Sequence, residues 1–166
     1  MFRTRPSDSL SLVPAANEAE ELDSGEGNAG EGPQDERELV AIVDPDLCLV
    51  RQRIAPLFAP YARICQARCL DEVYELCRNE HHIALALVEL DLPGEASCGS
   101  WAGHPGFEAL ELLCAQYPTA YVSVLSRHIR TDYVNRAQYL GAKYISKLGG
   151  YENLRALAKA FGKQAA

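Results

Sequence analysis

The chain has 166 residues, enough for one ordinary domain with a single hydrophobic core. Its net charge is −7, and the acidic excess lies in residues 1–38, which carry 3 basic and 10 acidic residues, whereas residues 39–166 carry 13 of each. This balance disfavours nucleic acid as a partner, because phosphate binding needs a local surplus of Lys and Arg. No apolar run approaches the ~18 residues of a membrane span and no signal peptide is present, so we expect a cytoplasmic protein without a membrane partner.

The N-terminal segment differs in composition from the rest of the chain. From residue 7 to residue 37 it consists mainly of Glu, Asp, Gly, Ser, Ala, Pro and Asn and has no aromatic residue. Such a segment buries too little apolar surface to offset the entropy of ordering. We therefore expect residues 1–37 to be a disordered acidic tail and residues 38–166 to form the folded domain.

Short apolar runs and stretches of helical periodicity alternate from residue 39 onwards. The apolar runs predict buried strands over 39–43, 61–66, 83–90, 120–125 and 143–146. The periodic stretches predict helices over 47–58, 70–78, 107–116, 132–140 and 151–161, with Pro56 either kinking or ending the first. Five strand–helix units in this order predict an α/β fold with a five-stranded parallel, doubly wound, flavodoxin-like sheet.

In such a sheet a binding site lies beyond the carboxyl ends of the strands. These ends offer a group of carboxylates, one hydroxyl and one amine, which converge from four strands. The residues are Asp44 and Asp46 after the first strand, Glu89 and Asp91 after the third, Ser126 after the fourth and Lys147 after the fifth.

This set resembles the receiver domain of bacterial two-component response regulators, and the resemblance extends over residues 39 to about 161. In that family two adjacent acids after the first strand hold Mg²⁺, and an aspartate after the third strand accepts a phosphoryl group, with Pro four residues later. A Ser or Thr and a Lys contact the phosphoryl oxygens. Asp44, Ser126 and Lys147 match these positions, and Tyr144 lies close to the family's switch aromatic.

The departures from the family pattern fall on its chemistry. Counting back four residues from Pro93 places Glu89 at the acceptor position, Pro45 replaces the second acid, and Leu148 replaces the usual Pro after the lysine. Mg²⁺ requires oxygen ligands in near-ideal geometry, so these changes should weaken its binding. We expect a degenerate pocket with no metal or cofactor, in which the longer Glu89 side chain extends toward Lys147.

Two alternatives would preserve phosphorylation. Asp46 could supply the missing metal ligand if the loop bulges by one residue, and Asp91 could be the acceptor if the third strand shifts by two residues, which keeps its faces unchanged. The chain would then be a working Mg²⁺-dependent phospho-receiver.

An insertion of about nine residues follows Pro93 and contains Trp101, the only tryptophan of the chain. Trp on a loop is a common anchor in protein interfaces, and a lid over the pocket is the alternative. A third reading of the chain is therefore a structural scaffold that uses the Trp101 loop.

Other site chemistries lack the residues that they need. Cysteines 48, 65, 69, 77, 98 and 114 include no C-x-x-C pair, which argues against a zinc site. We expect them to be reduced thiols, because disulfides are rare in the cytoplasm. No glycine-rich loop follows the first strand to bind a nucleotide or flavin phosphate, and Ser126 lacks a G-x-S-x-G turn. His128 could touch Glu89, although a solvated loop histidine is the simpler expectation. We expect no enzymatic activity.

A basic rim surrounds the predicted switch position. It comprises Arg127, Arg130, Arg136 and Lys143 beside Tyr144. In receivers this face binds partners, whereas an ordinary solvated face is the alternative, and the acidic tail could mask the rim. We expect a stand-alone atypical receiver that acts in signalling by phosphorylation-independent protein contact with a kinase, an effector or a second copy of itself.

Overall fold

The computed structural model describes residues 37–94, 104–149 and 151–164. The predicted tail and the Trp101 insertion fall outside these ranges, except for their flanking residues. The part of the chain from Asp35 onward forms one compact unit. Within the described ranges, no helix has the length and apolar character needed to cross a bilayer.

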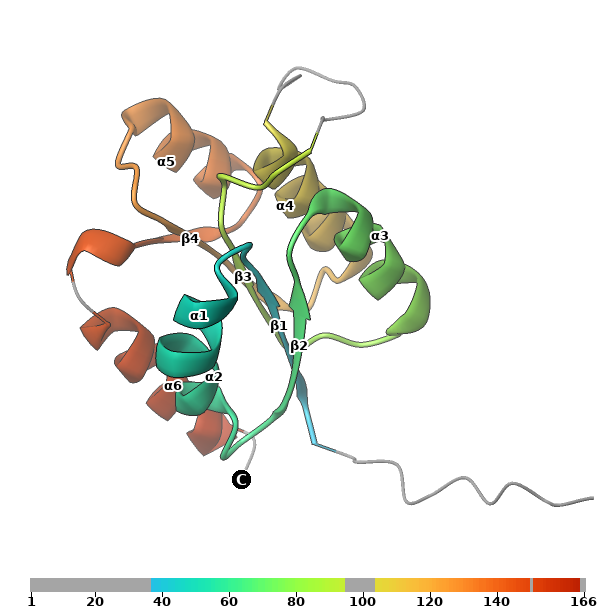
Figure 1. Cartoon of the computed structure of the whole chain (residues 1–166), viewed down its shortest axis with the longest axis vertical. Helices are drawn as coiled ribbons and strands as arrows, with labels where there is room; N and C mark the ends of the chain where they lie inside the picture. The colour runs from blue at the N-terminus through green and yellow to red at the C-terminus, as the bar shows by residue number, and fades with distance from the viewer. Residues whose placement is uncertain (1–36, 95–103, 150, 165–166) are drawn as a thin grey trace, which may run out of the picture. The chain divides into compact units, whose positions relative to one another are not determined.

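A single parallel sheet lies at the centre of the fold (Figure 1). Its strands are β1 (Leu39–Val43), β2 (Arg63–Ala67), β3 (Leu85–Val88), β4 (Tyr121–Ser126) and β5 (Lys143–Ser146), in the order β2-β1-β3-β4-β5. The predicted strands over 39–43 and 143–146 are confirmed to the residue. β3 is shorter than predicted, because Glu89 and the residues after it leave the sheet.

Helices cover both faces of the sheet (Figure 1). They are α1 (Leu47–Leu49), η1 (Val50–Ile54), α2 (Ala55–Phe58), α3 (Leu70–Asn79), α4 (Pro105–Gln116), α5 (Thr131–Tyr139), η2 (Lys147–Gly149) and α6 (Glu152–Gln164). The α1–η1–α2 segment and α6 pack on one face through Ile54, Phe58 and Phe161. The helices α3, α4 and α5 pack on the other through Val73, Phe107 and Ala137.

The first predicted helix is continuous but contains a π-helical turn before Pro56. The amide of Ala55 donates to the carbonyl of Val50, five residues back. A proline ring collides with the carbonyl four residues before it in a regular helix, and the wider turn relieves this collision. Pro56 therefore neither breaks nor shortens the helix, which ends at Phe58.

Two glycines fix the loops at the carboxyl and amino ends of the sheet. Gly141 has a φ of +83° directly after α5, the left-handed geometry typical of a residue that follows a helix. Gly106 lies against the chain that leaves β3, where an added Cβ atom would come within 2.3 Å of the Leu90 carbonyl oxygen. The start of α4 thus holds the segment that follows Glu89.

A cluster of thiols and phenols lies beneath α3, away from the strand ends. Burial raises the pKa of Cys65 to about 12, and burial beside the Cys77 thiol raises the pKa of Tyr117 to about 12. The Tyr117 hydroxyl donates to the Glu80 carbonyl at 2.8 Å. The buried thiols therefore stay protonated at neutral pH and serve packing.

The thiol cluster predicts a loss of stability at alkaline pH. In the unfolded chain Cys and Tyr ionise at about 8.5 and 10, so the folded state binds more protons above these values. The free energy of unfolding should hold up to about pH 8 and fall as the pH rises toward 12. Urea unfolding at pH 8 and 11 measures this fall, which should shrink in Cys65→Ala. The exposed Cys48 provides the matched control, because Cys48→Ala should leave the fall unchanged.

Candidate functional site

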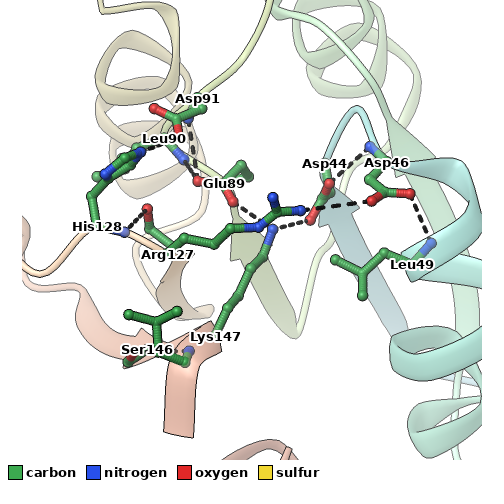
Figure 2. A network of polar contacts seen from close by, with 12 residues as sticks. Asp44, Asp46, Leu49, Glu89, Leu90, Asp91, Arg127, His128, Ser146 and Lys147 are labelled. Atoms are coloured by element: carbon green, nitrogen blue, oxygen red, sulfur yellow. Dashed lines mark hydrogen bonds and ion pairs between the residues drawn. The ribbon is translucent and has the colours of Figure 1, made fainter. Parts of the chain in front are cut away.

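Four of the predicted site residues occupy the carboxyl ends of four strands. Figure 2 shows three of them, Asp44, Glu89 and Lys147. Asp44 directly follows β1, Glu89 follows β3, Ser126 ends β4 and Lys147 follows β5. The strand registers align these ends, since Val43 pairs with Val88 and Ser126 pairs with Ser146. β2 lies on one side of β1, whereas β3, β4 and β5 follow on the other side, so the strand order switches direction between β1 and β3. Asp44 and Glu89 lie at this switch point, where doubly wound sheets bind ligands.

Lys147 lies between the two acids. Its Nζ atom is 2.6 Å from Asp44 Oδ2 and also contacts Glu89 Oε2. All three side chains are buried, with exposed fractions of 5% for Lys147, 2% for Asp44 and 6% for Glu89. We call these three residues the lysine cluster. It contains two carboxylates and one ammonium group, so its formal charge is −1.

The other two carboxylate oxygens of the lysine cluster bind backbone amides. Asp44 Oδ1 accepts a hydrogen bond from the amide of Asp46 at 2.9 Å. Glu89 Oε1 accepts one from the amide of Leu90 at 2.7 Å and a longer one from that of Asp91 at 3.2 Å. Each of the four oxygens therefore has a partner from the chain itself, as buried carboxylates require.

The acids Asp46 and Asp91 lie outside the lysine cluster. Asp46 caps α1, because its Oδ1 accepts from the amide of Leu49 at 2.9 Å, and its Oδ2 is 3.8 Å from an Arg127 nitrogen. Asp91 is 59% exposed, and its Oδ2 is 2.8 Å from Nε2 of His128. His128 thus meets Asp91 rather than Glu89, a contact that the sequence reasoning missed.

The hydroxyl of Ser126 is fully buried and turned into its own loop. Its Oγ accepts a hydrogen bond from the amide of His128 at 3.2 Å. This is a common way for a serine to hold a turn. The arrangement gives Ser126 a structural role in the β4–α5 loop.

Tyr144 connects the β4–α5 loop to β5. Its hydroxyl donates to the backbone carbonyl of His128, and burial raises its pKa. A groove of about 1050 Å³ lies beside it, between α5 and α6. Ile129, which lines this groove, is an apolar residue with an exposed fraction of 65%. An exposed apolar residue beside a groove is typical of a contact surface.

The basic rim carries less free positive charge than the sequence suggests. Arg130 pairs with Asp132 at 2.8 Å, and Arg136 pairs with Glu111. Arg127 approaches Asp46, as described above, whereas Lys143 is exposed at the start of β5. The surface around Tyr144 is thus close to neutral and partly apolar.

Comparisons with known proteins identify the architecture. No family model and no curated protein matches the sequence. Among solved structures, the beryllofluoride-activated receiver domain of DrrB has a TM-score of 0.60 and 18% identity, over 76% of this chain and 98% of that chain. A CheY-like receiver from Methanospirillum hungatei has a TM-score of 0.59 and 19% identity, over 77% and 98%. The receiver domain of an HD-domain protein from Pseudomonas fluorescens has a TM-score of 0.61 and 21% identity, over 77% of this chain and 95% of that chain.

The chain has the receiver fold. The match includes 98% of the DrrB receiver domain and 98% of the Methanospirillum receiver. The described domain is therefore comparable in extent to these receiver domains. Within this fold Glu89 holds the position after β3, and Pro45 follows Asp44 without offering a side-chain oxygen. The receiver architecture therefore presents Asp44, Glu89 and Lys147 at the carboxyl ends of its strands.

Two sequence expectations concern residues that the structure does not fully describe. Trp101 and Cys98 lie between the described residues 94 and 104, so the Trp101 loop stays a prediction. Across 37–94, 104–149 and 151–164, no group of three His, Cys, Asp or Glu side chains is arranged to hold a metal ion. The five described cysteines are all free thiols.

Proposed function

We propose that this receiver-fold domain acts in signalling without accepting a phosphoryl group and without catalysis. In this account the lysine cluster holds the pocket in one fixed state. The domain then regulates by contact with a partner protein, such as a kinase, an effector or a second copy of itself.

The observation that carries this proposal is the position of Lys147. Its ammonium group contacts both buried carboxylates, and the chain already supplies partners to all four of their oxygens. A phosphoryl group would add negative charge to a cluster whose formal charge is already −1. Its oxygens would have to displace an internal ion pair that is desolvated and hydrogen-bonded.

The donor set of the pocket is a poor fit for Mg²⁺. The ion prefers octahedral oxygen coordination and usually takes one or two carboxylates together with water and phosphate oxygens. Pro45 provides no side-chain oxygen, and the carboxylate of Asp46 is directed to the amide of Leu49. Asp44 uses one oxygen for Lys147 and the other for a backbone amide. We therefore propose that no cofactor takes part.

The surface around Tyr144 supports protein contact as the output. It combines a groove between α5 and α6 with the exposed residue Ile129, which lines that groove. The neighbouring arginines are paired with carboxylates, which favours a partner surface that is neither strongly acidic nor a phosphate backbone. We infer that this face, which we call the Tyr144 face, meets the partner.

A working phospho-receiver is the second candidate, and Asp91 is the residue that could support it. It is 59% exposed and therefore accessible to a phosphodonor. However, it lies outside the buried cluster and contacts His128 instead of Lys147. Phosphorylation there would have neither the lysine nor a second acid to stabilise the transferred group.

Incubation of the full chain with acetyl phosphate and Mg²⁺ tests the proposal. A conventional receiver that takes phosphate under the same conditions serves as the positive control, and intact-mass spectrometry provides the measurement. We expect no mass corresponding to a phosphorylated chain. A stoichiometric phosphorylated species that disappears in Asp91→Asn or Glu89→Gln would refute the proposal and would identify the acceptor.

A further inference from the structure

The β4–α5 loop, residues 127–130, contacts two other loops at the carboxyl edge of the sheet (Figure 2). Through Arg127 it approaches Asp46 in the loop after β1, and through His128 it contacts Asp91 in the loop after β3. These contacts join segments that are far apart in the sequence. The loop therefore has a position that depends on side chains from its neighbours.

His128 uses its side chain and its backbone in different directions. Its ring contacts Asp91 at 2.8 Å, while its amide donates to Ser126 Oγ and its carbonyl accepts from Tyr144. One residue thus connects the loop after β3 with the aromatic side chain of β5. A shift of the His128 backbone would therefore move the ring that contacts Asp91 and the carbonyl that Tyr144 binds at the same time.

Asp91 also connects with the lysine cluster. Its amide donates to Glu89 Oε1 at 3.2 Å, and the other oxygen of Glu89 contacts Lys147. A continuous series of polar contacts therefore runs from Lys147 through Glu89, Asp91 and His128 to Tyr144. Because coupling between sites needs such physical contacts, this series is a route by which the pocket and the Tyr144 face could bias each other.

We propose that Asp91 is a positioning residue whose contact with His128 holds the β4–α5 loop where Tyr144 can bind the His128 carbonyl. We call the contact between Asp91 and His128 the clasp. Its relevance to regulation rests on the proposed function of the Tyr144 face, but its existence does not depend on phosphorylation or on a partner. In this proposal Asp91 positions a loop and does not accept a phosphoryl group.

Both side chains of the clasp are exposed to solvent, which favours the breaking of their contact. The side chain of His128 is 56% exposed and that of Asp91 is 59% exposed, so water competes for both groups. Exposed contacts between polar side chains contribute little to global stability. The clasp is therefore suited to setting a local conformation, whereas the buried lysine cluster holds the fold around the pocket.

NMR spectroscopy of the full chain, without Mg²⁺ or phosphodonor, tests the clasp. We expect Asp91→Ala to raise the exchange rate of the His128 amide about two- to fivefold, in line with the loss of one exposed side-chain contact. The ring resonances of Tyr144 should shift in the same variant. The melting temperature should stay close to that of the unmodified chain, which separates local positioning from general destabilisation.

Asp132→Ala is the matched control. Asp132 is also an exposed acid paired with a basic residue of the β4–α5 loop, but its partner Arg130 lies two residues away and the pair joins no second loop. This variant should change neither the His128 amide nor the Tyr144 ring. Asp91→Glu should restore part of the protection.

Equal behaviour of Asp91→Ala and Asp132→Ala would overturn the clasp. So would a loss of protection spread over the whole sheet in Asp91→Ala alone. These results are separate from a failure of the proposed function, because phosphorylation of the chain by acetyl phosphate would contradict that function and leave the NMR comparison unaffected.

Discussion

Lys147→Met should destabilise the domain by about 3–5 kcal/mol, the usual cost of removing one partner from a buried ion pair. The variant would leave the carboxylates of Asp44 and Glu89 buried side by side without the ammonium group that now lies between them. Urea unfolding at neutral pH measures the change as a difference in the free energy of unfolding.

Two further variants make this prediction specific to the lysine cluster. Lys143→Met removes an exposed lysine four residues earlier and should change stability by no more than about 0.5 kcal/mol. Adding Glu89→Gln to Lys147→Met should recover part of the loss, because one of the two uncompensated charges is then gone. A similar loss in both lysine variants, or no recovery in the double variant, would contradict a cluster stabilised by its internal charge balance.

Restoring the acids of the receiver pattern should create metal binding. In Pro45→Asp combined with Glu89→Asp, a second carboxylate stands beside Asp44, and the acceptor side chain is one methylene shorter. The shorter side chain should loosen the contact with Lys147 and leave oxygens available to Mg²⁺. We expect the double variant to bind Mg²⁺ at least about tenfold more tightly than the unmodified chain, a difference of about 1.4 kcal/mol.

The single variants show which change matters. Pro45→Asp alone should gain little, since Lys147 still contacts both carboxylates, and Glu89→Asp alone still lacks the second acid. Calorimetric titration of all three variants with Mg²⁺ provides the measurement. If the double variant binds no better than either single variant, the missing acids do not explain the altered pocket.

The strands could be located from the sequence because β1, β3 and most of β4 are short apolar runs, and β2 and β5 also contain apolar residues between polar or glycine-containing loops. The strand 39–43 is buried on both faces, and its five residues are all apolar. Helix periodicity then located the helices to within a few residues at each end. The π-helical turn at Val50–Ile54 could not be predicted, because Pro56 is compatible with a kink, an early end or a widened turn.

The side chains of the site could be assigned to strand ends, but their contacts could not. The approach of Glu89 to Lys147 was expected from the extra methylene of glutamate, and the structure places these side chains in contact. The pairing of His128 with Asp91 depends on how two loops fold toward each other, which periodicity does not encode. The pairing of Arg136 with Glu111 was missed for the same reason, since Glu111 lies on a different helix.

The side chains of the pocket, and not the receiver fold by itself, determine which activity is possible. A fold positions strand ends, and the side chains at those ends decide which chemistry is possible. Here the strand ends carry an internal ion pair in which Lys147 contacts Asp44 and Glu89. In the function that we propose, the domain regulates through contact of its surface with a partner protein.

Calorimetric titration of the full, unmodified chain with Mg²⁺, in the absence and presence of beryllofluoride, tests the central claim most directly. Beryllofluoride stands in for a phosphoryl group on a carboxylate. The account predicts no heat of binding at millimolar concentrations of either component, because Lys147 and backbone amides already occupy the carboxylate oxygens of the pocket. Saturable binding of beryllofluoride that requires Mg²⁺ would contradict the account and would show that the pocket still accepts a phosphoryl group.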